Sequence, residues 1–64
     1  MSLKDLELRR AALVAENQYL TARKQFWSVR NFNNLVKRDQ ELIDQNNLLI
    51  ASIDRRIENE FNFG

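Results

Sequence analysis

An apolar residue at every seventh position over most of the chain is the feature that most constrains its fold. The series occupies position a of a heptad repeat and comprises Leu8, Ala15, Ala22, Val29, Val36, Ile43, Ile50 and Ile57. In the second half of the chain the same face is widened by Leu35, Leu42, Leu49 and Ile53. A seven-residue apolar repeat keeps one face of an α-helix against a neighbouring helix. The sequence therefore predicts an all-α, coiled-coil-type fold with these residues as its interface seam.

A second apolar face runs along the first half of the chain. It also repeats every seven residues and comprises Leu6, Leu13, Leu20 and Trp27. On a helix of 3.6 residues per turn this second face lies about 140° from the interface seam. Tyr19 and Phe26 add large apolar side chains beside the seam. One neighbouring helix cannot cover both faces, so the first half of the chain is expected to pack against two neighbours.

Little in the sequence would interrupt a helix, because Pro is absent and the only Gly is Gly64. Ser2 and Asp5 have the spacing of a capping box, which predicts a helix start near Leu3. Without an internal breaker, helix is expected to continue to about Phe61, where Asn-rich and Gly-containing sequence favours a stop.

The segment Asn31-Phe32-Asn33-Asn34 is the place where the helix is expected to bend or break, since Asn tolerates left-handed geometry and caps helices. The seam keeps its register through this segment, which favours one long helix. The alternative is a helical hairpin that sets the second face against the C-terminal half of the seam and dimerises into a four-helix bundle. In either case residues 1–64 form one helical association module, divided into a two-faced helix at 1–30, a candidate bend or turn at 31–34, a seam-bearing helix at 35–61 and a tail at 62–64.

Composition narrows the classes of function. A chain of 64 residues buries only a modest core, and zero Cys and zero His exclude disulfides and the usual metal ligands as stabilisers. Oligomerisation or a protein partner is therefore expected, whereas an enzyme, a bound cofactor and a metal site are not. The charged N-terminal sequence predicts no signal peptide, and the longest apolar run, Ala11 to Ala15, is too short to span a membrane. We expect a soluble chain that is intracellular or part of an assembled particle.

The middle of the chain is basic and aromatic. Between Asn17 and Arg38 there is no acidic residue. The candidate nucleic-acid contacts in this region are Arg23, Lys24, Arg30, Lys37 and Arg38. They alternate with aromatic residues, a mixture that can bind phosphates and stack on bases. A small helical nucleic-acid-binding module that uses residues 19–38 is therefore an alternative function.

Two further features concern contacts with other helices. Asn46 falls at a core position of the repeat, where a buried Asn often sets the register of a coiled coil, and Asn17 has the same relation to the second face. Phe61 and Phe63 place two aromatic side chains at the C-terminus, which suggests a docking terminus.

The leading hypothesis is a non-enzymatic structural subunit that packs through helix–helix contacts in a homo-oligomer or a larger complex, for example a scaffold or virion component. The third hypothesis is a helical adaptor or inhibitor of one protein partner. None of the three requires a membrane.

Overall fold

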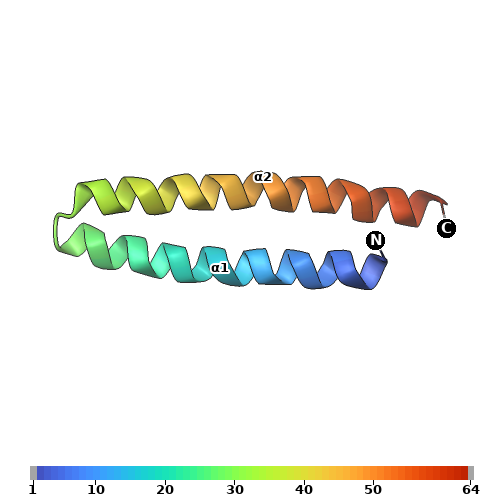
Figure 1. The fold of residues 1–64 in the computed structure, drawn as a ribbon, viewed down its shortest axis with the longest axis horizontal. Helices are drawn as coiled ribbons and strands as arrows, with labels where there is room; N and C mark the ends of the chain where they lie inside the picture. Colours follow the sequence, from blue (N-terminus) through green and yellow to red (C-terminus); the bar gives the residue numbers. More distant parts are fainter. Residues whose placement is uncertain (1, 64) are drawn as a thin grey trace.

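The chain folds into a hairpin of two antiparallel helices that lie side by side (Figure 1). The computed structural model describes residues 2–63, with only the backbone described for Phe63. Helix α1 spans Leu3–Val29 and helix α2 spans Asn33–Phe63. Together they form a rod with extents of 50 × 15 × 13 Å. The all-α prediction is confirmed, and so is the hairpin of the alternative.

The single long helix that the unbroken register favoured is not formed, because the chain reverses at residues 30–32. Asn31 adopts the left-handed conformation with φ of 62°, which costs Asn less than most residues. The amides of Asn31 and Phe32 donate to the carbonyl oxygens of Ser28 and Trp27, at 3.1 and 3.0 Å, and so close the end of α1. The heptad pattern runs unbroken through the turn, but it does not prevent the chain from reversing there. Reversal is favourable because it lets α2 cover the second face of α1.

The helix ends follow local capping chemistry. The Ser2 hydroxyl accepts a hydrogen bond from the Asp5 amide at 3.2 Å, so the predicted N-terminal cap is present. Helix α2 starts inside the predicted turn segment, where the Phe32 carbonyl accepts from the amides of Leu35 and Val36. It also continues to Phe63, past the expected end near Phe61.

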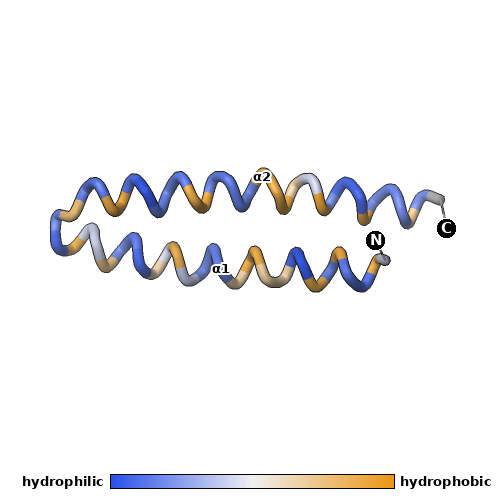
Figure 2. The backbone as a smooth tube through the Cα atoms, viewed as in Figure 1, coloured by the Kyte–Doolittle hydropathy of each residue, from blue (hydrophilic) through white to orange (hydrophobic). Residues whose placement is uncertain are grey.

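The core lies between the second face of α1 and the C-terminal half of the interface seam on α2. The most buried apolar side chains are Leu6, Leu20, Ile43 and Ile53. Figure 2 shows hydrophobic segments mainly on the side of α2 that faces α1, but on both sides of α1. The hairpin therefore covers one apolar face of α1, and among residues 2–63 no other segment packs on the opposite face.

A substitution at Leu20 tests how much this core contributes to the free energy of unfolding, and the same substitution at Leu48 is the matched control. Leu20 is 3% exposed and Leu48 is 74% exposed, so the same change to Ala removes packed methyl groups at one site and solvated ones at the other. We expect Leu20→Ala to lower the free energy of unfolding by about 2–5 kcal/mol, and Leu48→Ala to change it by about 0.5 kcal/mol or less. Urea unfolding followed by circular dichroism measures both. Equal effects of the two substitutions would contradict the described core.

The left-handed residue of the turn gives a second prediction. Asn31→Val should lower the free energy of unfolding by about 1–2 kcal/mol, because a β-branched residue is strained at positive φ. Asn31→Gly should leave stability unchanged or raise it, since Gly has no Cβ to clash. The same unfolding measurement applies, and a Val variant as stable as the Gly variant would rule out the observed turn geometry.

Candidate helix-association interface

The hairpin divides the predicted interface seam into a covered half and an exposed half. On α2, Ile43 and Ile53 are buried, and the half-buried members are Leu35, Val36, Leu42, Ile50 and Ile57, while Leu49 is exposed. On α1 the seam points away from α2: Leu8 is 61% exposed and Val29 is 75% exposed, with Ala15 and Ala22 also exposed. The predicted second face, in contrast, is covered by α2, with Leu6 and Leu20 buried and Leu13 and Trp27 half-buried.

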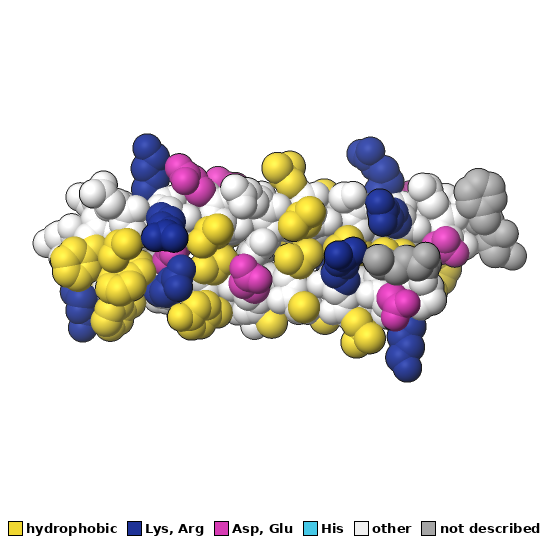
Figure 3. All heavy atoms as spheres, viewed as in Figure 1, with side chains coloured by type: hydrophobic (Ala, Val, Ile, Leu, Met, Phe, Trp, Pro, Cys, Tyr) yellow, Lys and Arg dark blue, Asp and Glu magenta, His cyan; other side chains and the backbone are white. Residues whose placement is uncertain are grey.

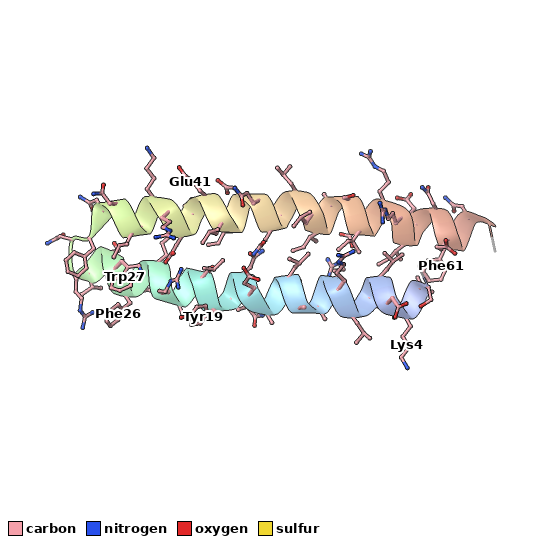
Figure 4. The ribbon with its side chains drawn as sticks, in the orientation of Figure 1. Lys4, Tyr19, Phe26, Trp27, Glu41 and Phe61 are labelled. Carbon is pink, nitrogen blue, oxygen red and sulfur yellow. The ribbon has the colours of Figure 1, made fainter. Side chains whose placement is uncertain are left out.

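The exposed half of the seam belongs to a wider apolar surface, which we term the outer stripe of α1. Its members alternate at spacings of four and three residues and comprise Leu8, Ala12, Ala15, Tyr19, Ala22, Phe26 and Val29. All seven are exposed. Figure 4 shows Tyr19 and Phe26 on the side of α1 opposite α2, with Trp27 between the helices, and Figure 3 shows hydrophobic side chains along the α1 edge of the rod. Spacings of this kind are those of a coiled-coil seam.

Ala12 was not singled out from the sequence, although it completes this stripe. The signal was available, because Ala12 stands seven residues before Tyr19, which itself stands seven before Phe26. The outward face of α2 differs from that of α1 in composition. It carries the exposed charged residues Lys37, Glu41, Asp44, Arg55 and Glu58. Leu48 is exposed among them.

Inside the hairpin, Arg23 of α1 and Asp39 of α2 form an ion pair near the turn. The Arg23 guanidinium donates two hydrogen bonds to the Asp39 carboxylate, from Nε at 3.0 Å and from Nη2 at 2.6 Å. Asp39 is only 2% exposed, so its charge depends on this partner. The hydrogen bonds from Arg23 hold the pKa of the Asp39 carboxyl below its ordinary value, against the opposing effect of burial. They also raise the pKa of Arg23.

Halfway along the hairpin the two predicted core asparagines meet. The Asn46 side-chain amide donates to the Asn17 side-chain oxygen at 3.0 Å, and Asn17 donates in turn to Asn47 at the same distance. Asn46 is buried, and within the described part of the chain no buried side-chain polar atom lacks a hydrogen-bond partner. The two asparagines are therefore accommodated in the core as a satisfied polar layer.

Towards the open end of the hairpin, a third polar link joins Arg10 of α1 to Asp54 of α2 at 2.6 Å. Both side chains are nearly half exposed, so salt and water screen this pair. Its position still agrees with the register that the other two links define.

The candidate nucleic-acid contacts gather at the turn end, but three of the five are engaged within the hairpin. Arg23 pairs with Asp39, and Lys24 Nζ donates to Gln40 Oε1 at 2.6 Å. The Arg30 guanidinium lies 3.6 Å from the centroid of the Phe26 ring, a cation–π contact. Lys37 and Arg38 are exposed on α2.

The aromatic rings at the turn end pack on one another. The Trp27 ring meets Phe26 and Phe32 edge to face, at centroid distances of 5.1 and 5.8 Å. Such contacts stabilise an aromatic cluster. At the other end of the rod Phe61 is 67% exposed, while the side chain of Phe63 lies outside the described residues.

Residues 2–63 contain no group of three or more acidic side chains arranged to hold a metal ion. Neither helix, within the same described range, has an apolar stretch long enough to cross a lipid bilayer. The arrangement offers packing surfaces and paired charges, which are the elements of helix association.

The lowered pKa of Asp39 predicts how stability depends on pH. In the unfolded chain Asp39 should titrate near its ordinary pKa of about 3.9, whereas in the hairpin it stays ionised at lower pH. Below about pH 4 the unfolded state therefore binds a proton that the folded state does not, and acidification favours unfolding. We expect wild type to lose more stability than Asp39→Asn between about pH 6 and pH 3, as measured by urea unfolding. Parallel pH profiles for the two proteins would refute this role of Asp39.

Comparisons with known proteins do not assign the chain to a family. No protein-family model matches it, and no curated protein or solved structure shows significant similarity to it. Any assignment of function therefore rests on the residues and contacts of the hairpin itself.

Proposed function

We propose that this chain is a non-enzymatic structural subunit that assembles by packing the outer stripe of α1 against another helix, in a homo-oligomer or a larger complex. The observation that carries the proposal is the exposure of seven consecutive members of an apolar heptad seam on one helix. Scaffolds and virions are assemblies in which such a subunit could serve.

The energetic argument is the unfavourable hydration of this stripe. Fully burying one large apolar side chain is worth about 1.5–3 kcal/mol. Leu8, Tyr19 and Val29 are 61–75% exposed in the isolated hairpin, and Phe26, which Arg30 and Trp27 contact, is 47% exposed. A contiguous exposed apolar surface of this kind is typical of an interaction site. A helix laid on the stripe would also stabilise the hairpin, because it binds the folded state alone.

The charged side chains support association over catalysis. The most buried charge, on Asp39, is engaged in the ion pair with Arg23, and the Asn17–Asn46 layer is satisfied within the hairpin. The sequence has no His or Cys to act as base or nucleophile. Polar groups inside the hairpin therefore act to align two helices.

The two alternative functions receive less support from these contacts. Phosphate binding through the basic segment would compete with the partners that Arg23, Lys24 and Arg30 already have. An adaptor that folds only on binding is at odds with three polar links that join the helices within one chain.

The test is to place charge on the outer stripe without disturbing the core. Ala15 and Ala22 are exposed members of the stripe, and Glu is a good helix former. The double variant Ala15→Glu with Ala22→Glu should therefore keep its helicity but fail to pack. The matched control, Gln45→Glu with Ala51→Glu, adds the same charge to exposed positions of α2.

Size-exclusion chromatography of extracts from native cells that express each tagged chain gives the measurement. Wild type and control should elute in a particle larger than the 7.6 kDa chain, and the stripe variant should elute as the single chain. The circular dichroism spectrum of the purified stripe variant should be the same as that of wild type. The proposal is wrong if wild type elutes as the single chain, or if the stripe variant stays in the larger particle.

A further inference from the structure

We propose that the helix covering the outer stripe is α1 of a second copy of this chain, running antiparallel to the first. This inference rests on the proposed function and adds the identity and direction of the partner. Two independent properties of α1, the order of side-chain sizes and the order of charges, carry it.

The sizes of the side chains along the outer stripe favour an antiparallel pair. Small residues predominate in its N-terminal half, where Ala12 and Ala15 lie, while Phe26 and Val29 stand at its C-terminal end. In a parallel pair each residue faces its own copy, so that Ala layers would leave voids and two Phe26 rings would crowd one layer. In an antiparallel pair Ala12 of each helix faces Phe26 of the other, and Leu8 faces Val29. The remaining layers pair Ala15 with Ala22 and Tyr19 with its own copy. The stripe is then complementary to itself, as a two-fold symmetric interface requires.

The charges of the hairpin point to the same direction. The turn half of the rod, residues 17–47, carries five Lys or Arg and three acidic residues, whereas the open half carries five Lys or Arg and six acidic residues. Along α1, residues 3–16 carry three acidic and three basic residues, whereas residues 17–29 carry Arg23 and Lys24 and no acidic residue. A parallel pair would bring two basic turn ends together. An antiparallel pair avoids this repulsion, because it sets each basic turn end beside residues 3–16 of its partner, where acidic and basic residues are equal in number. It also opposes the two helix dipoles favourably.

The angle between the two apolar faces of α1 defines where the second copy lies. On a coiled-coil wheel of 3.5 residues per turn, the centre of the outer stripe lies about 150° from the face covered by α2. In a square four-helix bundle, the two faces of a helix that contact its neighbours are about 90° apart around the helix axis. The second copy therefore packs on the side of α1 opposite α2, and the dimer has its two α1 helices inside and its two α2 helices outside.

Sedimentation equilibrium of the purified chain, with no other protein present, tests the identity of the partner. The stripe from Leu8 to Val29 is about 31 Å long, which makes a small interface, so the measurement should run from about 1 µM to about 1 mM. We expect the apparent mass to double over this range for wild type and for Gln45→Glu with Ala51→Glu. Ala15→Glu with Ala22→Glu should stay monomeric.

Single-cysteine variants test the direction, because the chain has no Cys of its own. Leu8→Cys and Val29→Cys replace exposed residues at opposite ends of the stripe. In an antiparallel pair, equivalent positions at either end are about 30 Å apart, so a short bismaleimide should link the two variants when mixed but neither one alone. Cross-linking of each variant to itself would show a parallel pair and overturn the inference.

A purified wild-type chain that remains monomeric up to about 1 mM would also overturn the inference, because no second copy then covers the stripe. That result leaves the proposed function standing if wild type still elutes in a large particle from native extracts and the stripe variant does not. Failure of the partner assignment and failure of the proposed function are thus distinguished by the two measurements.

Discussion

The structure depends on the burial of the second face of α1 by the seam of α2. Leu6 and Leu20 come from one helix and Ile43 and Ile53 from the other, and the described part of the chain has no third element that could cover them. Because helices in proteins gain most of their stability from packing an apolar face and not from helix propensity, each helix depends on this contact. The turn at Asn31 allows this contact, because it folds α2 back along α1. The outer stripe stays exposed because α2 covers only the opposite face of α1.

Polar contacts determine how the two helices align. Apolar packing alone tolerates several registers, since a heptad slide again sets one apolar residue beside another. The Arg23–Asp39 pair and the Asn17–Asn46 layer join residues that lie nearly equally far from Asn31 in the sequence. Both occupy core positions of the repeat or lie directly beside them, where an unpaired charge or amide would be costly. The hairpin thus trades some hydrophobic contact for a unique alignment.

Much of the fold follows from the sequence, but the choice between its two forms does not. The two faces, the Ser2 cap and the turn segment were readable from heptad spacing and residue type. The heptad pattern that continues through Phe32 favours one long helix. The pattern gives only the spacing of apolar residues along one helix, and it does not include the free energy gained when α2 covers Leu6 and Leu20. Arg23 was read as a nucleic-acid contact, since its relation to Asp39 appears only when the chain folds back at Asn31. The function of the outer stripe stays a proposal, because spacing shows that a surface is apolar and not what covers it.

The spacing of the polar links has a mechanical consequence. Sliding one helix along the other by a heptad in one direction would bring Asp39 beside Glu16 and Asn46 beside Arg10, in place of the partners that they have now. The short connection of three residues after Val29 also limits how far the two helices can slide past each other. The hairpin is therefore stiff against axial shear, and it can act as a strut that holds whatever binds at its two ends about 50 Å apart.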